Sequence, residues 1–76
     1  MITIKKAWYV NQLPTHIVAE LETDRLVMFM MTPFRKIKSD EMLPYKGHHP
    51  DKCTSYPVPN YVLRHYGLIA QEEAGT

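Results

Sequence analysis

The chain has 76 residues, of which 45% are hydrophobic and 22% are charged, and its formal net charge is +1. This length has room for a single domain whose core supplies no more than about 3–5 kcal/mol. The balance of 9 basic and 8 acidic residues lacks the basic excess that is typical of dedicated nucleic-acid binders. Its one cysteine, Cys53, excludes an intramolecular disulfide and suits a reducing compartment.

Two further observations bear on location. No apolar run approaches the ~18 residues that are needed to cross a bilayer. The charged opening Met1–Lys6 does not resemble a signal peptide. We therefore expect no membrane association and a cytoplasmic protein.

The first predicted element is a strand over Thr3–Val10, because apolar and polar side chains alternate there. Ile4, Trp8 and Val10 are expected to share one face. Lys6 interrupts that face, and a long cation of this kind is typical of a strand at the edge of a sheet. The opposite face would carry Thr3, Lys5, Ala7 and Tyr9.

A loop around Pro14 leads to a second predicted strand over His16–Leu21. Its alternation places Ile17, Ala19 and Leu21 on one face. Residues 22–25 then form a hairpin connection without an Asn-Gly signal, which favours a type I turn or a longer loop.

The third predicted strand, Leu26–Met31, is apolar on both faces. We expect it to be the most buried strand and interior to the sheet. Its free edge could pair with the first strand, in the order 2-3-1, or with Phe34–Ile37, and the sequence leaves both open. A chain this small can cover one face, so the second face needs more sheet, more chain or another molecule.

Residues 33–59 contain five of the six prolines, which predicts mostly irregular structure, either a binding loop or a segment that conceals short elements. Within it, Ser39–Leu43 could form one helical turn, with Ser39 as its cap and Pro44 as its terminator.

A short helix is predicted near the end of the chain. Pro59 suits its first turn, and Gly67 suits a left-handed cap after its last turn, accompanied by an apolar contact from Leu68. Spacing places Val62, Leu63 and Tyr66 on one face, against the sheet. Residues 71–76 are expected to fray.

The expected fold is therefore a single α+β domain over residues 1–70, with an antiparallel sheet of three to four strands, one short C-terminal helix and a long Pro-rich loop. A small β-barrel is the alternative.

Catalytic and metal chemistry find little support in the sequence. His48, His49 and Cys53 could bind zinc, with His16 or His65 completing the set, but the spacing matches no familiar finger and there is no second cysteine. A nucleophilic pair of Cys53 with a histidine lacks any visible oxyanion loop. We predict no enzyme, no metal and no cofactor.

Binding is the remaining class of function. Lys5, Lys6, Trp8 and Tyr9 could stack on single-stranded bases, although Trp8 is expected in the core. Protein binding fits better, because the chain is rich in tyrosine and methionine and an open strand edge would admit a partner strand.

The chain resembles the small RNA polymerase-binding transcription regulators of Xanthomonas phages. The resemblance is carried by its size, its opening Met1-Ile2-Thr3-Ile4-Lys5-Lys6-Ala7-Trp8-Tyr9, its single cysteine and its lack of catalytic motifs. It implies a monomer in the host cytoplasm, near RNA, that binds the β′ amino-terminal region and the β flap of the host enzyme. Such a protein displaces the σ factor during initiation and suppresses termination, without catalytic residues or a cofactor.

Six residues are predicted to contact the partner. We expect Tyr9 to act as an anchor and five cations to steer the chain toward an acidic surface. The five cations are Lys5, Lys6, Arg35, Lys36 and Lys38.

Two alternative functions remain open: a single-stranded nucleic-acid-binding module and a phage inhibitor of a different host enzyme.

Overall fold

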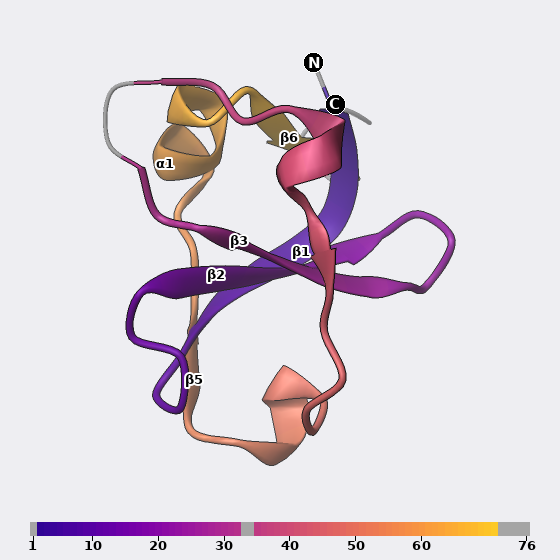
Figure 1. The fold of residues 1–76 in the computed structure, drawn as a ribbon, viewed down its shortest axis with the longest axis vertical. Coiled ribbons are helices and arrows are strands. Elements are labelled where there is room, and N and C mark those ends of the chain that lie inside the picture. The colour runs from indigo at the N-terminus through magenta and orange to yellow at the C-terminus, as the bar shows by residue number, and fades with distance from the viewer. Residues whose placement is uncertain (1, 33–34, 72–76) are drawn as a thin grey trace.

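The computed structural model describes residues 2–32 and 35–71 (Figure 1). Within them, six strands form a small open mixed sheet, which one short α-helix accompanies. This arrangement confirms the predicted α+β class. The elements are β1 (Ile2–Val10), β2 (His16–Leu21), β3 (Leu26–Met30), the 3-10 turn η1 (Ser39–Glu41), β4 (Leu43–Pro44), the 3-10 turn η2 (Pro50–Lys52), β5 (Ser55–Pro57), α1 (Asn60–His65) and β6 (Leu68–Ala70).

The strand order is β4-β3-β2-β1-β5, and β6 pairs parallel to β1. The sheet is thus larger than the predicted three to four antiparallel strands. Of the two partners left open for the third strand, the first strand (order 2-3-1) is wrong, because β2 lies between β1 and β3. The third strand is also not the most buried, since β2 is more buried than β3. On the free edge of β3, Leu43 pairs with Met28. Of the other predicted partner, Phe34–Ile37, Phe34 lies outside the described residues, and β4 takes this position instead.

The prediction that β1 is an edge strand is also wrong. Its nine residues are long enough for two successive neighbours on the side opposite β2. Ile2–Ile4 pair with β6, and Trp8–Val10 pair with β5. Lys6 lies where one neighbour gives way to the other. Its charge therefore marks a gap between two short strands, not the edge of the sheet.

A β-bulge in β1 corrects the predicted faces of that strand. Ile4 pairs with Leu21 and Lys6 pairs with Glu20, so Lys5 is an extra residue on β1. A bulge of this kind inverts the alternation on one side of it. Ile4 consequently packs in the same cluster as Ala7, and not with Trp8 and Val10 as predicted.

Alternation along β2 and β3 follows the prediction and divides the core into two clusters. We call the side of the sheet that carries Ile17, Val27 and Phe29 the closed face, and the side that carries Trp8 and Val18 the open face. The closed face holds the larger cluster, which also includes Ile4, Ala7, Ala19, Ile37, Val58, Leu63, Tyr66, Leu68 and Ala70.

Helix α1 covers the closed face. Pro59 is its N-cap, just outside the predicted first turn, and the left-handed Gly67 (φ 80°) follows its C-cap, as predicted. Six residues form only a marginal helix in isolation. Packing holds it, since Leu63 is buried and the Tyr66 ring meets Phe29 edge-on at 5.6 Å between centroids. Leu68 does more than the predicted cap contact, because it begins β6.

The Pro-rich segment 33–59 is less irregular than predicted, since it contains η1, β4, η2 and β5. The predicted turn is present as η1, but its N-cap is Lys38 and not Ser39. Glu41 accepts a hydrogen bond from the Lys38 backbone N–H at 3.0 Å, so a carboxylate replaces the predicted hydroxyl cap. Pro44 belongs to β4. In the predicted tail, Gln71 is exposed and residues 72–76 lie outside the described residues.

No helix among residues 2–32 and 35–71 combines the length and the apolar character that a membrane crossing requires.

Candidate functional site: an apolar pocket on the open face

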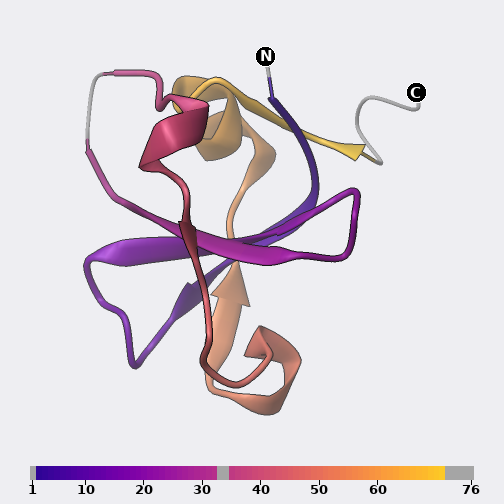
Figure 2. The same ribbon diagram turned by 45° about the vertical axis from the view of Figure 1, so that its right-hand side comes forward.

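The open face is covered by residues 45–53, which we call the strap. It runs from the end of β4 through η2 toward β5 (Figures 1 and 2). Backbone bonds hold the chain at both ends of the strap: the Tyr45 N–H donates to the Leu26 carbonyl at 3.1 Å, and the Asn11 N–H, next to the end of β1, donates to the carbonyl of Thr54, the residue after the strap, at 3.1 Å. The strap is therefore a fixed cover, held by turns and not by a helix.

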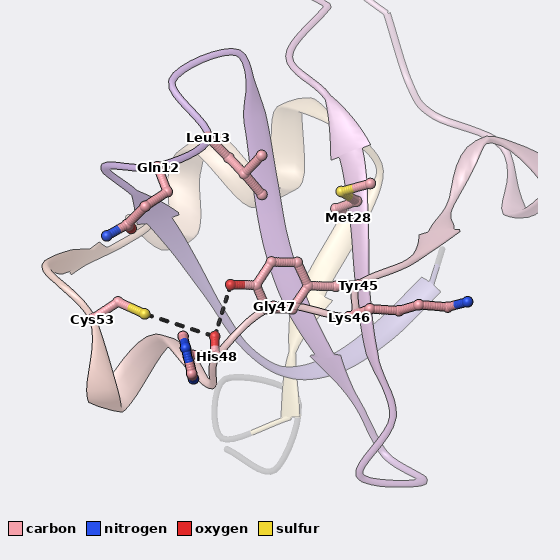
Figure 3. A pocket seen from close by; sticks show the side chains of 8 residues that line it. All are labelled: Gln12, Leu13, Met28, Tyr45, Lys46, Gly47, His48 and Cys53. Atoms are coloured by element: carbon pink, nitrogen blue, oxygen red, sulfur yellow. Dashed lines mark hydrogen bonds between the residues drawn. The ribbon is translucent and has the colours of Figure 1, made fainter.

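Between the strap and the sheet lies a pocket of about 340 Å³. Its walls are mostly apolar, and they come from three parts of the chain that are distant in sequence: the β1–β2 turn, β3 and the strap. Figure 3 shows Leu13, Met28 and the Tyr45 ring converging, while the Lys46 side chain points outward. The complete lining is Gln12, Leu13, Met28, Tyr45, Lys46, Gly47, His48 and Cys53.

Hydrogen bonds within the strap shape the pocket wall. The Tyr45 hydroxyl donates to the His48 carbonyl at 2.7 Å, and the Cys53 thiol donates to the same oxygen at 3.8 Å (Figure 3). Gly47 allows the Tyr45 ring to approach the strap closely, because a Cβ at Gly47 would fall 2.6 Å from the tyrosine oxygen. Burial raises the pKa of the Tyr45 phenol.

Apolar surface continues from the pocket along the sheet. Leu43 on β4 lies directly opposite Met28, and Met30 lies two residues further along β3, on the same face. Met30 is 58% exposed and Leu43 is 50% exposed. Since Met28 also lines the pocket, these side chains and the pocket form one apolar surface, which we call the pocket surface.

Two of the residues that could have bound zinc, His49 and Cys53, make other contacts. The His49 ring meets Trp8 edge-on, with 5.4 Å between centroids, and its Nδ1 accepts the Asp51 N–H at 3.1 Å. His49 Nε2 lies 3.8 Å from a Glu20 oxygen. Cys53 lines the pocket. The described part of the chain holds no cluster of three or more His, Cys, Asp or Glu side chains placed to bind a metal ion.

Three of the residues predicted to contact a partner, Arg35, Lys36 and Lys38, lie on the segment just before η1. Arg35 binds Glu41 through two hydrogen bonds of 2.9 and 2.5 Å, and this guanidinium, with the Lys38 N–H, lowers the pKa of the Glu41 carboxyl to about 2. Lys38 is exposed, and the stem of Lys36 lies against Gly67. This segment is at the opposite end of the molecule from η2 (Figures 1 and 2).

The other three predicted residues lie on β1, and they do not form one surface. Lys5 makes an ion pair with Asp24 in the β2–β3 turn, which raises the pKa of the lysine. The Lys6 ammonium lies 5.6 Å from the Trp8 ring centroid, on the open face. Tyr9 is half-buried against the closed-face cluster. Its phenol pKa is raised by burial first and by the nearby tyrosines second.

Comparison with protein-family models, with curated proteins and with solved structures found no match. The site therefore has to be interpreted from its own residues.

Sequence reasoning identified the apolar second face of β3 but missed the residues that turn it into a pocket. Alternation places Met28 and Met30 together. Nothing in the local sequence, however, indicates that Leu43 and Tyr45 return to β3, because β4 has only two residues and no periodicity. The signal that was present is the surplus of apolar side chains on one strand.

Proposed function

We propose that this chain is a non-enzymatic docking protein whose pocket surface binds a partner protein. The observation that carries the proposal is the exposure of Met30 and Leu43 beside an apolar pocket. Large apolar side chains gathered in one patch, unlike single scattered ones, mark interaction sites. Methionine suits such a surface because its flexible thioether adapts to different partners.

The edges of the sheet favour docking through side chains over the addition of a partner strand. β4 and β5 terminate the main strand order, and they end in Pro44 and Pro57. Proline has no N–H to offer a new strand, and strands of two or three residues make poor templates. Addition of a partner strand at these edges, which the sequence had suggested, is therefore disfavoured.

For the partner, we propose host bacterial RNA polymerase, as the family resemblance implies. Binding at the β′ amino-terminal region and the β flap would displace the σ factor at initiation and suppress termination later. Occlusion of this kind requires only favourable binding energy and overlap with the surface that σ uses. A small domain with a preformed apolar surface meets this requirement without a catalytic group, and it would act in the host cytoplasm.

Exposed cations support association with an acidic partner surface. Lys6, Lys36 and Lys38 are exposed, although Arg35 is already held by Glu41. Such charges mainly accelerate encounter, and salt screens them. The pocket surface would supply the affinity.

A binding measurement on purified bacterial RNA polymerase core enzyme tests the proposal. We expect wild type to bind and to compete with σ, and Met30→Glu to weaken binding at least about tenfold, because it places a charge in an apolar contact. Thr23→Glu is the matched control, since Thr23 is exposed in the β2–β3 turn. The proposal is wrong if wild type does not bind, or if Met30→Glu binds as tightly as Thr23→Glu.

A further inference from the structure

The pocket itself has features that select a particular ligand. We propose that it accepts one large apolar side chain of a partner peptide, phenylalanine or leucine, whose neighbouring residue is acidic and pairs with Lys46. This inference rests on the proposed function, because it names what the docking protein recognises.

Size supports a single side chain. At about 340 Å³, the pocket lies at the small end of the range for ligand sites, roughly 300–1,000 Å³. Its walls are side chains of the turn, of β3 and of the strap, and hydrogen bonds fix the strap before any ligand arrives. A preformed pocket does not have to be ordered upon binding, which favours recognition of a short segment.

The polar groups of the wall explain why the ligand should be apolar. The Tyr45 hydroxyl and the Cys53 thiol both donate to the His48 carbonyl. These donors are thus used within the wall, and the surface that faces the cavity is mostly the apolar side chains of Leu13 and Met28 and the tyrosine ring. A polar side chain entering here would lose its water without gaining an equivalent partner.

Charge at the rim explains why the neighbouring residue should be acidic. Among the eight lining residues, Lys46 carries a full positive charge, and none of the eight is acidic. Its side chain extends outward from the rim (Figure 3). A flexible lysine stem can follow an acidic group that lies just outside the cavity.

Titration of the ¹⁵N-labelled protein with N-acetyl-Glu-Phe-Glu-amide tests this inference by NMR. We expect the amide signals of Leu13, Gly47, His48 and Cys53 to shift, and those of α1 to stay unchanged. The control peptides N-acetyl-Glu-Ala-Glu-amide and N-acetyl-Lys-Phe-Lys-amide should shift the pocket signals at least about threefold less at equal concentration. Absence of pocket shifts with the first peptide, or equal shifts with all three peptides, would overturn the proposal.

A charge-reversal pair of variants isolates Lys46. We expect Lys46→Glu to weaken binding of Glu-Phe-Glu at least about threefold at low salt, since it replaces an exposed attraction by a repulsion. Lys38→Glu changes the net charge equally, on the segment before η1 at the opposite end of the molecule from η2, and should bind within twofold of wild type. Equal affinities of the two variants would overturn the role of Lys46.

The outcomes separate this inference from the proposed function. If the acidic peptide shifts the pocket signals but RNA polymerase does not bind, the polymerase proposal fails and the pocket specificity stands. If polymerase binds and no peptide shifts the pocket signals, the docking function stands and the pocket specificity fails.

Discussion

The two faces of the sheet use the same strands and end in different states. On the closed face, Phe29 is 1% exposed beneath α1, whereas its neighbour Met28 on the open face is half-buried beside a cavity. The two faces differ in the elements that cover them. Helix α1 and β6 contribute the large side chains of Leu63, Tyr66 and Leu68 to the closed face. The strap contributes the Tyr45 ring, Cys53 and the His49 ring, which meets Trp8 edge-on.

This difference shows how a short chain can leave apolar surface exposed without losing its fold. A helix lays a continuous apolar stripe on a sheet. A strap of tight turns needs its backbone hydrogen bonds satisfied locally, as between the Cys53 N–H and the Pro50 carbonyl, and its side chains meet the sheet at separate points, not along a stripe. The closed face therefore carries the larger part of the buried core, and the open face keeps apolar side chains exposed beside the pocket.

Truncation of adjacent residues on the two faces should give the largest contrast. Phe29→Ala should cost about 3–5 kcal/mol, which equals the whole stability expected of so small a domain, so this variant should be largely unfolded. Met28→Ala should cost less than about 2 kcal/mol, because the methionine is only half-buried. Urea denaturation followed by circular dichroism measures both. Equal losses would mean that the two faces contribute equally.

Substitution of one glycine in the cover of each face should give smaller losses of stability. Gly67→Ala should lose about 1–2 kcal/mol, because an L side chain is strained at φ 80° and its Cβ would crowd the Lys36 stem at 3.2 Å. Gly47→Ala should instead displace the Tyr45 ring and break its bond to His48, worth about 1 kcal/mol.

Amide NMR spectra of the two glycine variants locate these effects. Changes from Gly47→Ala should be confined to the strap and the pocket, and Tyr45→Phe, which deletes the same hydrogen bond without adding an atom, serves as its control. Perturbation of α1 by Gly47→Ala would contradict the independence of the two faces.

The smallest expected effect concerns the ion pair of Arg35 and Glu41, which lies away from the pocket. The folded pKa of Glu41, about 2, is below its ordinary value of 4.5. The carboxylate therefore stabilises the fold fully above pH 4.5, and this contribution is lost as the pH falls toward 2. Glu41→Gln should lower the Tm slightly at neutral pH, and the difference from wild type should disappear near pH 2. A difference independent of pH would exclude this explanation, and binding to the acidic peptide should not change.

Much of the fold could be predicted from local sequence, and the site could be predicted only in part. Alternation identified β2, β3 and the two faces, and Pro59 with Gly67 bracketed α1. The Lys5 bulge could not be predicted, because one extra residue leaves no mark in composition yet inverts the face of Ile4. The partners of β1 and β3 were missed since three-residue β6 and two-residue β4 have no periodicity of their own. The pocket depends on these long-range pairings.

The methionines report on both faces at once and give the most direct test. Met28 and Met30 belong to the pocket surface, whereas Met31 and Met42 pack against the closed-face cluster. We would label the methionine methyl groups with ¹³C and record their NMR signals while adding purified RNA polymerase core enzyme. The account predicts that the signals of Met28 and Met30 broaden or shift well before those of Met31 and Met42. Perturbation of Met31 and Met42 first, or of all four equally, would contradict it.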